Sequence, residues 1–232
     1  MNSPVLPSIV AIALAYLVGA VPFGFLIARL FKGVDVREHG SGNIGATNVG
    51  RVIGRPWGVL ALICDILKGF LPVFLAAWYM DGLDWGGACP STPVVLCGAA
   101  AICGHVWPVY LRLKGGKGVA TSCGVLLYLE PLGTAIAVAV WIAAVAIWRY
   151  VSLGSILAAL TLVGYVLVMA PRRGGGCTAL IVFGIAMASV VIVRHRSNIK
   201  LLLEGTENRV GGKKRQEVAE DGEDTGQADD KE

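Results

Sequence analysis

Long apolar runs, each near the length of a bilayer crossing, dominate this 232-residue chain. A helix needs about 20 mostly apolar residues to cross about 30 Å of hydrocarbon. The runs show no period-two alternation of the kind that transmembrane β-barrels have, so they are predicted to be helices. Only 16% of the residues are charged and 55% are hydrophobic, which excludes disordered and collagen-like chains. Spans are predicted near residues 5–30, 56–80, 91–112, 131–149, 152–170 and 174–193.

The segment 118–129 leaves the number of crossings open between six and seven. It is too short for a full crossing, so it is either a half-span or the start of one long kinked helix interrupted at Glu130 and Pro131. The first apolar run lacks a basic leader and a cleavage site, so we expect a span there and not a signal peptide. The fold class is therefore all-α, a polytopic membrane protein of about seven helices.

Basic residues predict the orientation, because cytoplasmic loops carry an excess of Lys and Arg. Seven crossings with the N-terminus outside place the basic residues of 29–55, of 112–117 and from 194 onward on the inside. The acidic loop 81–90 then lies outside, and only Arg172 and Arg173 break the rule. Six crossings would separate the C-terminal basic cluster from the first two. We therefore predict seven crossings and a cytoplasmic C-terminus.

Three further features carry little functional information. The polar, acidic stretch 211–232 is predicted to be a disordered tail after a membrane domain of residues 1–210. The six cysteines lie mostly inside predicted spans and form no C-x-x-C pair, so we expect free thiols and no metal site. The net charge of +4 is no nucleic-acid signature, because the charges lie at the ends of spans.

Three polar clusters lie on the predicted inside face. The first, residues 40–51, combines glycines with Ser, Asn and Thr and ends in an arginine. Glycines allow close backbone approach to a ligand, and a guanidinium suits phosphate. A set of turns that caps the next helix is the plainer alternative.

The second cluster runs from Gly104 to Thr121 and places three cations and a glycine run at the head of an apolar helix. Helix N-termini bind anions through free N–H groups. It is not a Walker loop, because Gly118 follows Lys117 where that motif requires Ser or Thr. An ordinary basic loop at lipid headgroups would explain the charge but not the glycines.

The third cluster, residues 194–207, follows the last predicted span and has a basic membrane-anchoring collar as its alternative. Within a predicted span, Asp65 and Lys68 share one helix face. Ionisable groups at membrane depth are functional candidates, although a structural ion pair is equally consistent.

Together the clusters favour an anionic, phosphate-bearing ligand at the membrane surface. Catalysis and transport both remain open on this evidence. A transporter predicts inverted repeats, and no motif has a second copy. A purely structural or regulatory membrane protein would leave the three clusters unexplained.

The three clusters resemble the signature motifs of the acyl-phosphate:glycerol-3-phosphate acyltransferase family of bacterial membranes. The segments are S-G-N-I-G-A-T-N-V-G-R at 41–51, K-G-G-K-G-V-A-T at 114–121, and H-R-S-N-I at 195–199 with G-T-E at 205–207. The resemblance covers about residues 10–210. It implies a seven-helix fold in the bacterial cytoplasmic (inner) membrane with a cytoplasmic active site. It also implies acyl transfer from acyl phosphate to the 1-hydroxyl of glycerol 3-phosphate, without cofactor or nucleic acid.

The resemblance also implies roles for individual residues. Leu201 stands where the family commonly has arginine, so one cation is missing. The His-x-x-x-x-Asp pair of another acyltransferase group is absent. We expect a substrate phosphate to take the hydroxyl proton, with no covalent acyl-enzyme. The implied catalytic residues are Ser41, Arg51, Lys117, His195 and Asn198, and the implied substrate-binding residues are Asn43, Thr47, Asn48, His105, Gly115, Gly116 and Gly118, of which the three glycines would let acyl phosphate approach the backbone.

Overall fold

The protein is all-helical wherever the computed structural model describes it, at residues 5–80, 90–173 and 177–211. The predicted outer loop 81–90 and tail 211–232 lie almost entirely outside these residues. The helices are α1 (Val5–Ala20), α2 (Phe23–Lys32), α3 (Ala46–Val52), α4 (Arg55–Met80), α5 (Thr92–Val106), η1 (Val109–Leu111), α6 (Val119–Leu129), α7 (Pro131–Trp148), α8 (Val151–Met169), η2 (Ala170–Arg173), α9 (Thr178–Arg194) and α10 (Arg196–Leu203).

The predicted all-α membrane architecture is confirmed. The bent pair α9 and α10, at 56° to each other, adds a sixth candidate span if it is counted as one crossing, and α6 is a shorter apolar helix. The count of seven crossings stays a prediction. Five helical stretches are long and apolar enough to cross a membrane: Val5–Lys32, Arg55–Met80, Thr92–Leu111, Pro131–Trp148 and Val151–Arg173.

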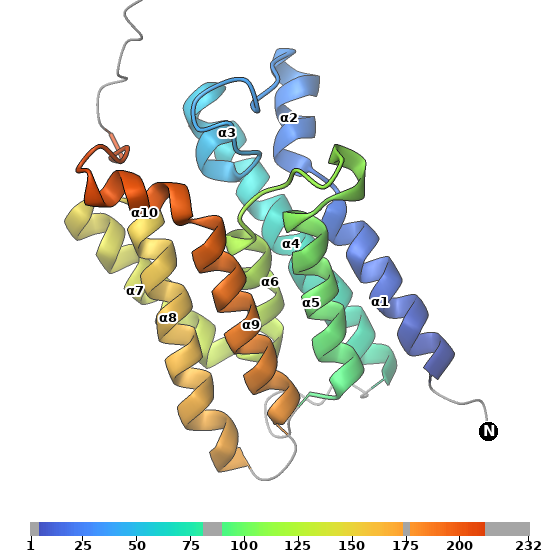
Figure 1. Cartoon of the computed structure of the whole chain (residues 1–232). Helices are drawn as coiled ribbons and strands as arrows, with labels where there is room; N and C mark the ends of the chain where they lie inside the picture. Colours follow the sequence, from blue (N-terminus) through green and yellow to red (C-terminus); the bar gives the residue numbers. More distant parts are fainter. Residues whose placement is uncertain (1–4, 81–89, 174–176, 212–232) are drawn as a thin grey trace, which may run out of the picture.

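The helices run in alternating directions, and one end of the bundle collects the polar segments (Figure 1). We call this end of the bundle the polar end; it is formed by α2, α3, residues 107–118 and α10.

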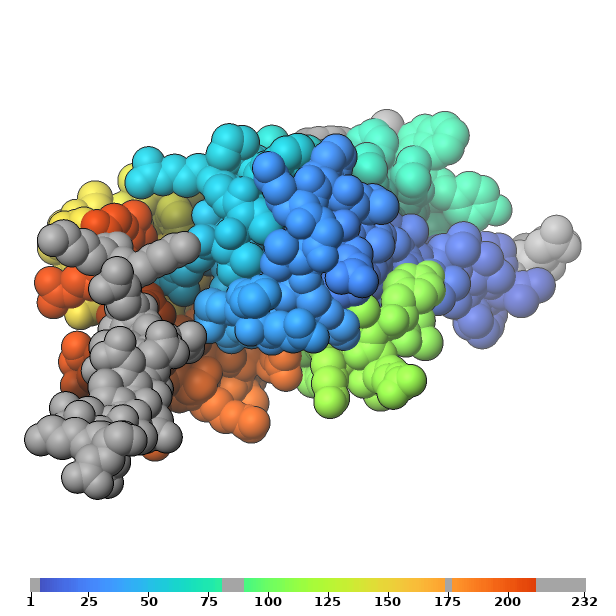
Figure 2. Space-filling model, turned by 90° about the horizontal axis from the view of Figure 1, so that it is seen from above, coloured from blue at the N-terminus to red at the C-terminus, as the bar shows by residue number. Residues whose placement is uncertain are grey.

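α6 runs away from the polar end and α7 returns toward it, so residues 118–149 do not form one long kinked helix. Seen from above, the segment between α2 and α3 lies between the loop that follows α5 and the C-terminal helices (Figure 2).

A buried ion pair lies at the end of the short α6, where Pro131 begins the next helix. Glu130 ends α6, only 1% of it is exposed, and its Oε2 accepts a 2.8 Å hydrogen bond from Nη2 of Arg173. A buried carboxylate needs such a partner. Arg173 broke the positive-inside pattern, and its pairing with Glu130 gives a physical reason for a cation at that end.

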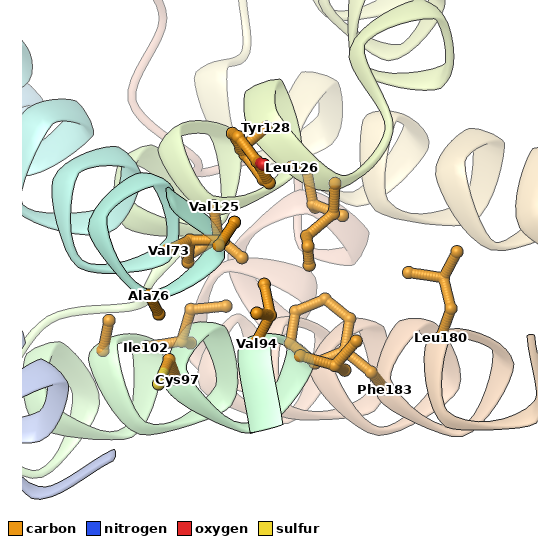
Figure 3. Close-up of a cluster of buried hydrophobic side chains, with 14 of the residues drawn as sticks. Val73, Ala76, Val94, Cys97, Ile102, Val125, Leu126, Tyr128, Leu180 and Phe183 are labelled. Atoms are coloured by element: carbon orange, nitrogen blue, oxygen red, sulfur yellow. The ribbon is translucent and has the colours of Figure 1, made fainter. Parts of the chain in front are cut away.

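Small residues bring the helix backbones close together. A Cβ on Gly19 would lie 2.1 Å from the Ala101 carbonyl oxygen, which fixes α1 against α5. A Cβ on Gly124 would lie 1.9 Å from the Ile66 carbonyl oxygen, which fixes α6 against α4. Such contacts are typical of helix packing in membranes. A buried cluster that includes Val94, Leu126, Leu180 and Phe183 fills the bundle below the polar end (Figure 3).

The cysteine prediction is wrong at one position. Cys64, Cys97, Cys103 and Cys123 are free thiols, as expected. Cys177, immediately before α9, is disulfide-bonded. Cys177 falls inside the predicted span 174–193, whereas α9 begins at Thr178 and leaves Cys177 at the helix end.

Candidate active site

A cavity of about 370 Å³ opens at the polar end and continues between the helices. Its upper part collects residues of all three polar clusters. Its lower part, which we call the apolar arm, is lined from α6, α7, α8 and α9 by Leu126, Val138, Trp141, Leu162, Phe183 and Met187. Phe183 and Val191, both cavity residues on α9, are about 12 Å apart along the helix axis. The cavity therefore joins a polar chamber to an elongated apolar one.

Asn48 holds the first polar cluster in shape. Its Nδ2 lies 2.9 Å from the Val36 carbonyl oxygen, 3.1 Å from that of His39 and 2.9 Å from that of Asn43. Its Oδ1 accepts a 2.8 Å bond from the Ser41 N–H. Asn48 is 2% exposed, so these carbonyls would otherwise be buried without partners. Its amide is therefore committed to the loop, although the residue also borders the cavity.

Four other polar residues of this cluster line the cavity. Asn43 Oδ1 accepts a 2.8 Å bond from the Gly45 N–H, which shapes the turn into α3. Ser41 and Thr47 are exposed at the cavity mouth, and Arg51 lies half-buried in the last turn of α3. The cluster therefore contributes hydroxyl groups and one guanidinium to the chamber.

The second and third clusters meet through one amide. Lys117 Nζ donates to Oδ1 of Asn198, and Asn198 Nδ2 donates to Glu207 at 2.9 and 3.1 Å. The Ser152 hydroxyl donates to the same carboxylate at 3.1 Å. Glu207 is 8% exposed. The carboxylate therefore orients Asn198, and Asn198 in turn presents its oxygen to Lys117.

The geometry of His195 fixes its tautomer. Its Nδ1 lies 2.8 Å from the Val191 carbonyl oxygen, which only accepts hydrogen bonds. A neutral ring therefore carries its proton on Nδ1, which leaves Nε2 as an acceptor. The residue is 2% exposed and borders the cavity. This tautomer suits a ligand hydroxyl that donates to Nε2.

The predicted glycines separate into two groups. Gly118 lines the cavity at the N-terminus of α6, where its φ of 83° favours glycine. Gly115 and Gly116 are not among the cavity-lining residues, and both pack against His105. His105 itself borders the cavity and is 4% exposed.

Asp65 and Lys68 form the ion pair that their spacing predicted. Their Oδ1 and Nζ atoms are 2.7 Å apart, and each side chain is 2% exposed. Lys68 Nζ also donates a 2.8 Å bond to the carbonyl oxygen of Val21 at the break between α1 and α2. His105 Nδ1 lies 3.7 Å from Asp65 Oδ1. Lys68 therefore ties the helix break to α4, which favours the structural interpretation.

Most predicted site residues meet at the cavity, but Ser152 and Glu207, which support them, were not among the predicted residues. Ser152 follows the turn between α7 and α8, and no motif singled it out. Glu207 stood in the third motif but was not predicted as a site residue, and its acidity against three nearby cations was the available signal. The predicted residues that line the cavity are Ser41, Asn43, Thr47, Asn48, Arg51, His105, Lys117, Gly118, His195 and Asn198.

Burial lowers the pKa of Lys117 from 10.5 to about 8; the carboxylate of Glu207 opposes this shift and the charges of Arg51 and Arg194 add to it. If charged Lys117 binds substrate, kcat/KM should fall above about pH 8 as its proton is lost. The pH dependence of kcat/KM reflects the pKa values of groups in the free enzyme. In Lys117→Arg the guanidinium stays charged, so the alkaline decline should disappear from a pH–rate profile. An unchanged decline in Lys117→Arg would assign it to another group.

The family model described as glycerol-3-phosphate acyltransferase matches residues 9–205 of the chain. The chain belongs to this family. A "Glycerol-3-phosphate acyltransferase" of Desulforudis audaxviator is 47% identical over 89% of this chain and 97% of the relative. One of Trichlorobacter lovleyi is 48% identical over 85% and 95%. The resemblance stated from the three motifs is therefore confirmed.

Two solved structures have the same fold. Both are crystal structures of PlsY (YgiH), described as an integral membrane glycerol 3-phosphate acyltransferase, and each is 39% identical over 88% of this chain and 96% of the other. The glycerol 3-phosphate form matches with a TM-score of 0.79 and the lysophosphatidic acid form with 0.76.

Proposed function

We propose that the protein transfers a fatty acyl group from acyl phosphate to the 1-hydroxyl of glycerol 3-phosphate. The products are lysophosphatidic acid and inorganic phosphate, and the reaction begins phospholipid synthesis. The observation that carries the proposal is the cavity, in which a cationic chamber continues into an apolar arm. This shape suits a small phosphate ester beside a fatty chain. The relatives described as acyltransferases and as glycerol 3-phosphate and lysophosphatidic acid forms support it.

In this proposal the residues act by binding and orientation. Arg51 and Lys117 reduce the repulsion between two phosphate groups, and Ser41 and Thr47 donate hydrogen bonds at the cavity mouth. Acyl phosphate is already activated, and phosphate is a good leaving group. Holding the two reactants in line supplies about 7–11 kcal/mol of the barrier reduction. Fixed donors at the developing oxyanion add to this.

The attacking hydroxyl gives its proton to a substrate phosphate in this mechanism, and no acyl-enzyme forms. Ser41 then positions substrate and does not act as a nucleophile. Mass spectrometry after incubation with acyl phosphate alone tests this point. We expect no acyl group on Ser41, and a Ser41 ester formed at the rate of turnover would contradict the mechanism.

We place the polar end at the cytoplasmic side of a bacterial inner membrane. Basic residues gather at that end, as the positive-inside rule predicts. The disulfide-bonded Cys177 lies at the start of α9, at the opposite end of the bundle (Figure 1). Disulfides persist in oxidising compartments, which supports an extracytoplasmic location for that end.

The experiment that tests the proposed function uses protein reconstituted in vesicles with labelled glycerol 3-phosphate and palmitoyl phosphate. We expect lipid-soluble label together with released phosphate, and little label from Lys117→Ala. Uptake of water-soluble label into the vesicle lumen without lipid product would instead establish transport. The apolar arm ends in a cluster of buried side chains that includes Phe183 and Leu180 (Figure 3). A packed apolar end of this kind favours an enzyme over a path for a water-soluble solute.

A further inference from the structure

Gly115 and Gly116, which precede Lys117, pack tightly against His105 of α5. The Gly116 N–H donates a 3.1 Å bond to the carbonyl oxygen of His105. A Cβ on Gly115 would lie 2.2 Å from that carbonyl oxygen, and one on Gly116 would lie 2.1 Å from His105 Nε2. Both distances are far below any tolerated contact, so this pair needs glycine for packing.

Arg194 holds the same two residues from α9. Its Nη2 donates to the Gly115 carbonyl oxygen at 2.8 Å, and its Nε donates to the Gly116 carbonyl oxygen at 3.2 Å. A guanidinium is suited to this task, because its planar donors engage two acceptors at once. Arg194 is half-buried and is not among the cavity-lining residues. Its guanidinium therefore acts on the loop and not on a ligand in the cavity.

Arg194 also lies next to chamber residues in the sequence. It is the last residue of α9, and His195 and Asn198 follow it at the bend into α10. Lys117 Nζ donates to Asn198, so the loop meets this segment at two places. One contact fixes the backbone before Lys117, and the other fixes its ammonium group.

We propose that Arg194 is a positioning residue, which holds the Gly115–Gly116 backbone against His105 and thereby places the ammonium group of Lys117 in the chamber. The inference rests on the proposed function in that Lys117 contacts substrate phosphate. It differs from a basic collar at lipid headgroups, which predicts that Arg194 and its neighbour Arg196 are interchangeable. It also differs from direct substrate binding, which predicts an effect that does not depend on Lys117.

The test compares Arg194→Gln with Arg194→Lys and with the matched control Arg196→Gln, which removes the same charge from an exposed side chain on the same segment. Misplacement of a binding group by about 1 Å costs up to 100-fold. We expect kcat/KM for glycerol 3-phosphate to fall about 10- to 100-fold in Arg194→Gln. Arg194→Lys should recover only part of the loss, and Arg196→Gln should stay within about twofold of the parent.

A double-mutant cycle with Lys117→Ala separates positioning from a structural or independent role. In the Lys117→Ala background, Arg194→Gln should have almost no further effect on kcat/KM. A full, additive loss there would overturn the proposal, as would an equal loss in Arg196→Gln. If Arg194→Gln does not yield folded protein, the same cycle with Arg194→Lys decides by the same criterion.

The activity of the parent protein distinguishes a failure of the proposed function from a failure of the proposed role of Arg194. A parent that transfers no acyl group contradicts the proposed function, whereas a parent with normal activity and additive variants contradicts only the positioning role. Binding of glycerol 3-phosphate, measured by calorimetry, provides a readout besides activity. We expect Arg194→Gln to weaken this binding in the parent background and to leave it unchanged in the Lys117→Ala background.

Discussion

Replacing Arg51 with alanine should reduce kcat/KM for glycerol 3-phosphate by about 100- to 1,000-fold, the range found when one charge-stabilising donor is removed from an active site. Arg51 lies in the last turn of α3 and borders the cavity. Lys117 borders the same cavity, so the two cations face one chamber, and the charge of Arg51 helps to lower the pKa of Lys117. Without Arg51, Lys117 alone would offset the charge of two phosphate groups.

Two control variants test whether the effect is specific to the guanidinium of Arg51. Arg51→Lys keeps the charge but loses the planar fork, so its activity should fall between those of the parent and Arg51→Ala. Arg55→Ala removes an exposed cation at the start of α4 and should have little effect. The comparison requires steady-state kinetics on folded, monodisperse samples. An Arg51→Ala enzyme within about fivefold of the parent would remove Arg51 from the proposed mechanism.

Replacing Asp65 with alanine should lower the free energy of unfolding by about 3–5 kcal/mol, the usual result of removing one partner from a buried ion pair. The Lys68 ammonium group would lose its partner at 2.7 Å while remaining 2% exposed. Its bond to the Val21 carbonyl oxygen does not neutralise the charge. Denaturant unfolding in mild detergent measures the difference.

The double variant Asp65→Leu with Lys68→Met distinguishes a structural pair from a functional one. Apolar replacement of both partners is often neutral or stabilising, so it should regain most of the lost stability. If the pair is structural, activity should return with stability. A stable double variant that stays inactive would instead assign a functional role to Asp65, which borders the cavity near His105.

The long helices could be predicted from the sequence, because a helix that crosses a bilayer needs a long run of apolar residues. The sequence also predicted the interruption at Glu130 and Pro131, but not the side chains that are buried at the helix breaks. Lys68 contacts the chain at the break after α1, and Arg173 contacts it at the break after α6. These partners are distant in sequence, and no local pattern links them.

The three motifs predicted most of the polar chamber, because their residue types suit a phosphate ligand. The apolar arm was not predicted. Its lining residues, such as Leu162 and Met187, have the same composition as lipid-facing helix surfaces, and only the packing of four helices makes them a cavity. Glu207 and Arg194 were missed as supporting residues for a related reason. Arg194 contacts Gly115 and Gly116, and Glu207 contacts Ser152 as well as Asn198. Spacing does not reveal contacts between such distant parts of the chain.

A comparison of acyl donors tests whether the protein transfers the acyl group of acyl phosphate to glycerol 3-phosphate. Purified protein in mild detergent is incubated with labelled glycerol 3-phosphate and with palmitoyl phosphate, palmitoyl-CoA or no donor. We expect lipid-soluble label only with palmitoyl phosphate, in equal amount to the phosphate released. Equal or greater label with palmitoyl-CoA, or none with any donor in a sample that still binds glycerol 3-phosphate, would contradict the account.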